Sequence, residues 1–196
     1  MSNSIRSFSQ ENLPTVGLLG LGVGLSAYIS CQAGVFDQAT CWIALALLVA
    51  GVLQIFSALR YQHQGRSHAA ATFLPFGIFW LSIIGYQIFP KLGVGQSPNA
   101  IAMFAYLSLW ALFAAIIFLA SFRQNVAVLW LYGSMMMSFL ALAADQLRAD
   151  HIFLIIGCIG GFMAAFFALY ICLAQLSQDC LGRRLLPLGK SLDPPE

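Results

Sequence analysis

Two short stretches of the chain could hold a negatively charged group without using a charged side chain. Asn12-Leu13-Pro14 starts the first predicted helix, and Ser97-Pro98-Asn99-Ala100 starts the fourth. Asn and Ser cap helix starts, and proline is favoured in the first helical turn. A helix start presents free amides and about half a positive charge, which attract anions. Asn12 and Asn99 are therefore candidate anion contacts, although the same residues also suit plain helix capping.

Ionisable side chains are almost absent from the apolar runs. Asp145 lies at the end of the fifth run, and Asp37 and Asp150 lie in connections. A pump or proton relay usually carries a buried carboxylate or histidine at mid-membrane. Three classes of protein remain open: a structural membrane component, a path for small neutral molecules, and a path for a small anion held by dipoles.

Metal, cofactor and catalytic chemistry find no support in the sequence. The three histidines fall in a loop or at a helix start, and the five cysteines show no CxxC spacing. Cys31 and Cys41 flank one connection and could pair in an oxidising compartment; the alternative is small buried apolar residues. The formal charge of +2 gives no reason to expect a nucleic-acid partner. We expect no metal, no cofactor and no enzymatic activity.

Composition predicts the elements that must position these residues. The chain of 196 residues is 60% hydrophobic and 8% charged, whereas soluble domains carry about 25% charged residues. Its apolar runs are continuous and close to the ~20 residues that a membrane-spanning helix needs. We expect a single all-α transmembrane domain over residues 1–196, with short tails at about 1–12 and 178–196. The six predicted spans are 13–31, 41–59, 70–89, 99–121, 126–144 and 152–176.

The basic residues predict the orientation of these spans. Seven lie on the side that holds both termini: Arg6, Arg60, Arg66, Arg123, Arg183, Arg184 and Lys190. Only Lys91 and Arg148 lie on the other side. Cytoplasmic loops carry the excess of Lys and Arg, so both termini are expected in the cytoplasm. The spans beginning near Asn12 and Asn99 would then enter from opposite sides, as in an inverted repeat.

Small residues recur at helical spacing in the first and last spans. Gly17, Gly20 and Gly24 share one side of the first span, and Gly157, Gly161 and Ala165 share one side of the last. Such stripes let helix backbones approach closely in a membrane. A compatible second interpretation is that they leave room for a solute.

Several stretches recur in the order typical of one known family. They are "QIFSAL" (54–59), "FGIFW" (76–80), "PKLG" (90–93), "PNA" (98–100), "YLSLW" (106–110) and "GRRLLPLG" (182–189). Together they resemble the acetate uptake transporter family, which comprises bacterial acetate–succinate permeases and fungal relatives. The resemblance implies a hexamer of six-helix protomers in the inner membrane. Each protomer would pass acetate and similar monocarboxylates, and in some members succinate, by proton symport or as a channel.

The resemblance also implies site residues. The family's N-P-A-P-L-G-L motif corresponds to residues 12–18, where Asn12, Gly17 and Leu18 agree and both prolines are displaced. These three are the expected carboxylate contacts, Asn99 marks the far end of the path, and Thr72 is expected to replace a lost hydroxyl.

The family's narrow constriction of Phe, Tyr and Leu corresponds here to Leu21, Phe76 and Met135, none of which keeps the family's residue. Phe76 lacks the tyrosine hydroxyl, so a drier neck is expected. Pro75 is predicted to kink or restart its helix. The remaining alternatives are a pore for neutral solutes such as urea or ammonia, and a membrane assembly protein that does not transport.

Overall fold

The computed structural model describes residues 15–36, 41–148, 151–183 and 185–189, and in these residues the fold is all-helical. Each of the six predicted spans is confirmed as a helix long and apolar enough to cross a membrane. The helices are α1 (Thr15–Gln32), α2 (Cys41–His63), α3 (Ser67–Ile88), α4 (Ala100–Ala120), α5 (Val126–Leu147) and α6 (His151–Leu181), with short 3-10 turns η2 (Phe89–Leu92) and η3 (Ser121–Arg123).

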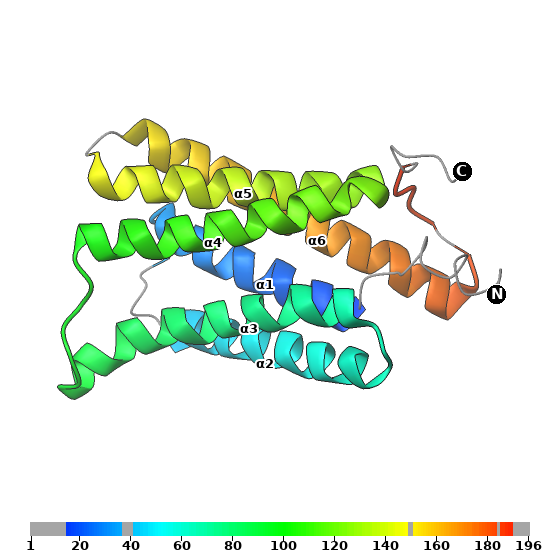
Figure 1. Ribbon diagram of the computed structural model, residues 1–196, viewed down its shortest axis with the longest axis horizontal. Coiled ribbons are helices and arrows are strands. Elements are labelled where there is room, and N and C mark those ends of the chain that lie inside the picture. Colours follow the sequence, from blue (N-terminus) through cyan, green and yellow to red (C-terminus); the bar gives the residue numbers. More distant parts are fainter. Residues whose placement is uncertain (1–14, 37–40, 149–150, 184, 190–196) are drawn as a thin grey trace.

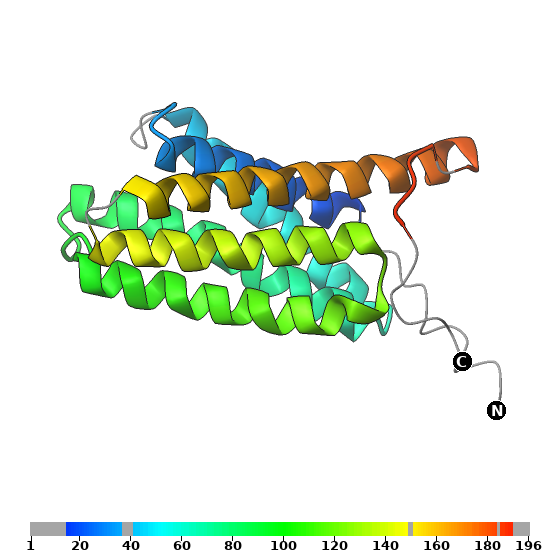
Figure 2. The same cartoon turned by 90° about the horizontal axis from the view of Figure 1, so that it is seen from above.

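The six helices form a ring. α2 packs on α3 and α1, α1 packs on α6, α6 packs on α5, and α5 packs on α4. Contacts between aromatic side chains of α3 and α4 close the circle of helices. Figures 1 and 2 show the helices lying along one long axis, which is horizontal in both views, with successive helices running in opposite directions. The order of the helices around the ring is their order in the chain.

Alternation of direction sorts the charged residues to the two ends of the bundle. One end holds the starts of α1, α3 and α5 and the ends of α2, α4 and α6 (right in Figure 1). Arg60, Arg66, Arg123 and Arg183 lie at this end, which we call the basic end. Lys91 and Arg148 lie at the opposite end.

The glycines of α1 allow close packing on the neighbouring helices α2 and α3. A Cβ atom at Gly17 would lie 3.0 Å from the Phe73 ring, and one at Gly24 would lie 2.6 Å from the Trp80 ring. At Gly20 a Cβ would lie 3.0 Å from the Ala50 carbonyl oxygen. These glycines therefore lower the helix propensity of α1 but let its backbone pack closely against its neighbours. Beside Gly17 and Gly24, aromatic rings fill the space that a solute was suggested to use.

The contact of α1 with α6 and the contact of α3 with α4, which join helices α1–α3 to helices α4–α6, differ in the size of their side chains. α1 meets α6 through small residues: a Cβ at Gly161 would collide with the Ile29 side chain. α3 meets α4 through large rings, with centroids 5.3 Å apart for Phe76–Phe113 and 5.0 Å for Phe79–Trp110. A seam of aromatic side chains thus separates α3 from α4.

Two local expectations can be compared with the structure. α3 continues through Pro75 from Ser67 to Ile88, so the helix does not restart there, while the alternative, a kink, stays a prediction. Proline removes one backbone hydrogen bond, a loss that packed transmembrane helices tolerate. Cys31 and Cys41 form no disulfide: Cys31 is buried and Cys41 is exposed.

Candidate functional site

The interior of the ring is uncharged. The buried polar side chains among the described residues, tyrosines and tryptophans aside, are Gln54, Ser57, Thr72, Ser121, Ser134, Ser138 and Gln175. In the described part of the chain, no Asp, Glu, Lys, Arg or His is buried. A solute inside the ring would therefore meet hydroxyls, amides, indoles and backbone groups, but no fixed ion.

The three residues of the expected neck lie in one buried cluster. Leu21, Phe76 and Met135 come from α1, α3 and α5 and are each 0% exposed. Full burial means that no water-sized space touches these side chains, so the neck is closed in this conformation. The Phe76 ring packs against Trp110 and Phe113 of α4, with centroids 6.3 and 5.3 Å away. Opening the neck requires these rings to move.

Three of the expected contact residues lie on the basic side of the neck. Gly17 and Leu18 are buried in the first turn of α1, and Thr72 is buried in α3. Gly17 lies against the ring of Phe73, the residue after Thr72, so Gly17 and Thr72 lie at about the same height along the bundle. The start of α1 is held to α6, because the Thr15 hydroxyl donates to Oε1 of Gln175 over 3.3 Å.

Of the two expected capping residues, only Asn99 belongs to the described part of the chain, and it lies apart from this group. Asn99 is exposed at the opposite end, where its side-chain oxygen accepts a 2.8 Å hydrogen bond from the Ala102 amide. Its capping function is therefore confirmed, while a contact with solute stays a prediction. Asn12 lies outside the described residues.

Sequence reasoning missed a set of buried polar atoms that have no hydrogen-bond partner. They are both amide atoms of Gln54, the indole nitrogens of Trp80 and Trp110, and the hydroxyl of Tyr132. Buried polar groups in native proteins are nearly always satisfied, so each exception needs an explanation. The four side chains come from α2, α3, α4 and α5. No local sequence pattern identifies these side chains, because only the lack of a hydrogen-bond partner on the other helices of the ring distinguishes them.

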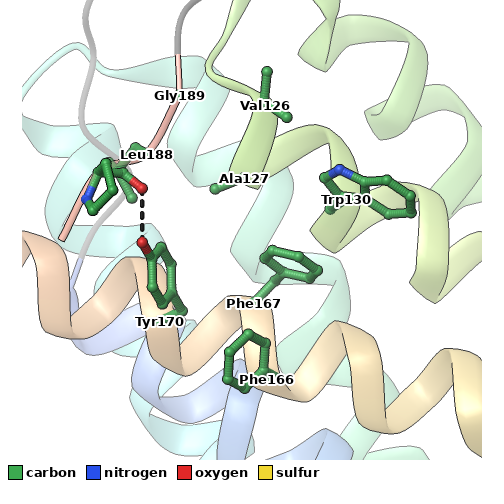
Figure 3. Close-up of a pocket in the computed structure, with 9 residues that line it drawn as sticks. Val126, Ala127, Trp130, Phe166, Phe167, Tyr170, Leu188 and Gly189 are labelled. Atoms are coloured by element: carbon green, nitrogen blue, oxygen red, sulfur yellow. Dashed lines mark hydrogen bonds between the residues drawn. The ribbon is translucent and has the colours of Figure 1, made fainter.

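A surface pocket of about 340 Å³ lies elsewhere, between α5, α6 and the chain that follows α6. Residues 185–189 fold back there (Figure 3): Tyr170 donates through its hydroxyl to the Pro187 carbonyl over 2.7 Å. Leu188 is buried, and its carbonyl accepts from the Ala127 amide over 3.1 Å. One of the free amides at the start of α5 is thereby satisfied. The pocket lies on the outside of the ring and does not belong to the candidate site.

Comparison with known proteins gives relatives over almost the whole chain. The succinate-acetate/proton symporter SatP of Escherichia coli is 25% identical over 92% of this chain and 96% of its own length. An uncharacterized protein of Methanothermobacter thermautotrophicus is 24% identical over 90% of both chains. The glyoxylate pathway regulator of Yarrowia lipolytica is 29% identical over 69% of this chain and 52% of its own.

The fold has a solved counterpart. The structure of the bacterial acetate channel SatP superposes with a TM-score of 0.86 at 24% identity, covering 92% of this chain and 99% of that one. The model of the GPR1/FUN34/yaaH family matches residues 8–181. This match confirms the family resemblance that we inferred from the sequence. The chain is a six-helix member of the GPR1/FUN34/yaaH family.

Proposed function

We propose that this protein transports acetate and similar short monocarboxylates across the inner membrane, through the interior of each protomer. SatP, a relative over almost the full length, is named as a succinate-acetate/proton symporter. The solved SatP structure is described as an acetate channel. A transporter of this class performs no chemistry on its solute and is not an enzyme.

The observation that carries this proposal is the uncharged interior with its unpartnered polar atoms. A bare carboxylate in a dry interior is very costly, whereas a neutral carboxylic acid costs far less. Buried indole and hydroxyl donors without partners, such as those of Trp80, Trp110 and Tyr132, would offset the lost hydration of a carboxyl group. The acid would pass the closed neck either protonated or as an anion accompanied by a proton.

The proposed path begins at the basic end, near Asn12, Gly17, Leu18 and Thr72. It crosses the neck of Leu21, Phe76 and Met135 and leaves near Asn99. We place the basic end in the cytoplasm because its Arg residues follow the positive-inside bias. We further propose a hexamer, in which neighbouring protomers and lipid cover the apolar outer faces of α2, α4 and α6.

The test is uptake of labelled acetate into proteoliposomes over a series of external pH values. Acetic acid titrates near the Glu value of about 4.3, so about one molecule in 500 is neutral at pH 7 and about one in 17 at pH 5.5. Protein-dependent initial uptake at low total acetate should therefore rise as pH falls, by up to about 30-fold. Protein-free vesicles, measured in parallel, supply the passive diffusion to be subtracted.

Competition separates this proposal from its rivals. Propionate and formate should compete with acetate, and a pH-sensitive dye in the vesicle should report proton entry with the acid. A pore for small neutral solutes such as urea or ammonia would pass labelled urea at a rate that ignores both pH and competing acids. A protein that does not transport would give no uptake above that of protein-free vesicles.

A further inference from the structure

Tyr132 presents a buried hydroxyl that nothing in the bundle uses. The side chain is 1% exposed, and its oxygen has no hydrogen-bond partner. The other tyrosines within the spans that have printed hydroxyl contacts bond locally or across helices, as Tyr28 does with Gln32 and Tyr106 with Ser82. An apolar core would be served as well by phenylalanine at position 132. The unused hydroxyl therefore needs an explanation.

The packing of α5 shows where Tyr132 points. α5 meets α4 at Gly133, where a Cβ would lie 3.0 Å from the Phe118 ring. It meets α6 at Ser134 and Ser138, and the Ser138 hydroxyl donates to the Gly157 carbonyl over 2.7 Å. With 3.6 residues per turn, the remaining face of α5 carries Tyr132, Met135 and Phe139.

Contacts of Phe139 confirm that this third face looks into the ring. Its ring centroid lies 5.2 Å from that of Phe79 on α3. Tyr132 lies seven residues before Phe139, almost two turns and about 10 Å nearer the basic end on the same face. Thr72 lies seven residues before Phe79, and α3 and α5 run in the same direction. Tyr132 and Thr72 therefore lie at about the same level.

That level is directly below the neck. Tyr132 precedes Met135 by three residues, one helical turn towards the basic end. Gly17 reaches the same level through its contact with Phe73, which follows Thr72. The neck residues Leu21, Phe76 and Met135 offer no hydrogen-bond donor of their own. The Tyr132 hydroxyl is thus an unpaired donor next to a barrier that has none.

We propose that the hydroxyl of Tyr132 donates a hydrogen bond to the carboxyl group of the solute as it enters the neck from the basic end. Tyr132 would then be a binding residue that favours carboxylic acids over neutral solutes of similar size. This inference rests on the proposed transport of monocarboxylates. It adds the side chain that recognises the shared carboxyl group.

The variant Tyr132→Phe tests the inference, because it removes only the oxygen. Loss of a hydrogen bond to a carboxyl group predicts uptake of acetate at low concentration reduced about fivefold to 30-fold. Propionate uptake should fall by the same factor, since the two acids share the carboxyl group. The melting temperature without solute should stay the same or rise, because an unsatisfied buried group is removed. Added acetate should stabilise the wild type more than the variant.

The matched control is Tyr170→Phe, which removes a tyrosine hydroxyl on the outside of the ring, where it bonds to Pro187. This variant should keep wild-type uptake. Equal acetate uptake by wild type and Tyr132→Phe overturns the inference alone. The inference also fails if Tyr132→Phe loses uptake but melts at a lower temperature than the wild type and is stabilised by acetate to the same extent. Absence of acetate uptake by the wild type overturns the proposed function and the inference with it.

Discussion

Gly24→Ala tests whether the first helix uses glycine for close packing. The added Cβ would lie 2.6 Å from Cε2 and 2.8 Å from Nε1 of Trp80. To restore an ordinary contact of 3.4 Å, the indole would have to retreat by about 0.8 Å. Trp80 is fully buried and packs against Tyr28 and Phe79, so it has no space to retreat. Overpacking of this kind costs about 1–3 kcal/mol.

Gly85→Ala in α3 is the matched substitution. A Cβ at Gly85 would meet Phe89 at 3.5 Å, an ordinary contact. Both variants gain up to about 1 kcal/mol of helix propensity, so this gain cancels when the two are compared. The difference between them isolates the cost of packing, about 1–3 kcal/mol, which corresponds to about 2–12 °C in melting temperature for a chain of this size.

The assay is thermal unfolding of both variants in the same detergent, followed by size-exclusion chromatography. Gly24→Ala should melt clearly below Gly85→Ala. Adding Trp80→Phe should recover part of the loss, because a smaller ring relieves the contact, and the two changes should be non-additive. Equal melting temperatures for Gly24→Ala and Gly85→Ala would refute the close-packing explanation.

Two further predictions concern the chain end and the neck. Gly189→Ala should free the segment 185–189, because Gly189 has φ of +79° and a Cβ there would lie 2.9 Å from the Cβ of Val126. Exchange of the Ala127 amide should then accelerate in hydrogen-exchange mass spectrometry. The control is Gly95→Ala, with φ of +75° and open space around it, which should leave the exchange of the Ala127 amide unchanged. Phe76→Tyr adds a hydroxyl to the dry neck, so the ratio of acetate to lactate and succinate uptake should change, and an unchanged ratio would show that the neck does not select.

The sequence by itself determined the spans and the cap of α4. Backbone groups in lipid must be hydrogen-bonded within the protein, and long continuous apolar runs, unlike the alternating strands of a barrel, therefore predict helices. The expected run 126–144 became α5 over Val126–Leu147, and Asn99 caps α4 as its position before the fourth run indicated. These features depend on neighbours within a few residues, which a sequence displays directly.

The tertiary structure alone decided which side chains meet across the ring. The glycine stripe of α1 indicated close packing, but not that Gly24 would receive Trp80. Pro75 predicted a kink or a restart, and the structure shows that α3 runs through it without a restart. Tyr132 resembles any other aromatic residue of a membrane helix until the absence of a partner for its hydroxyl is known. Whether a polar atom is satisfied depends on groups distant in sequence, and only the folded ring brings them together.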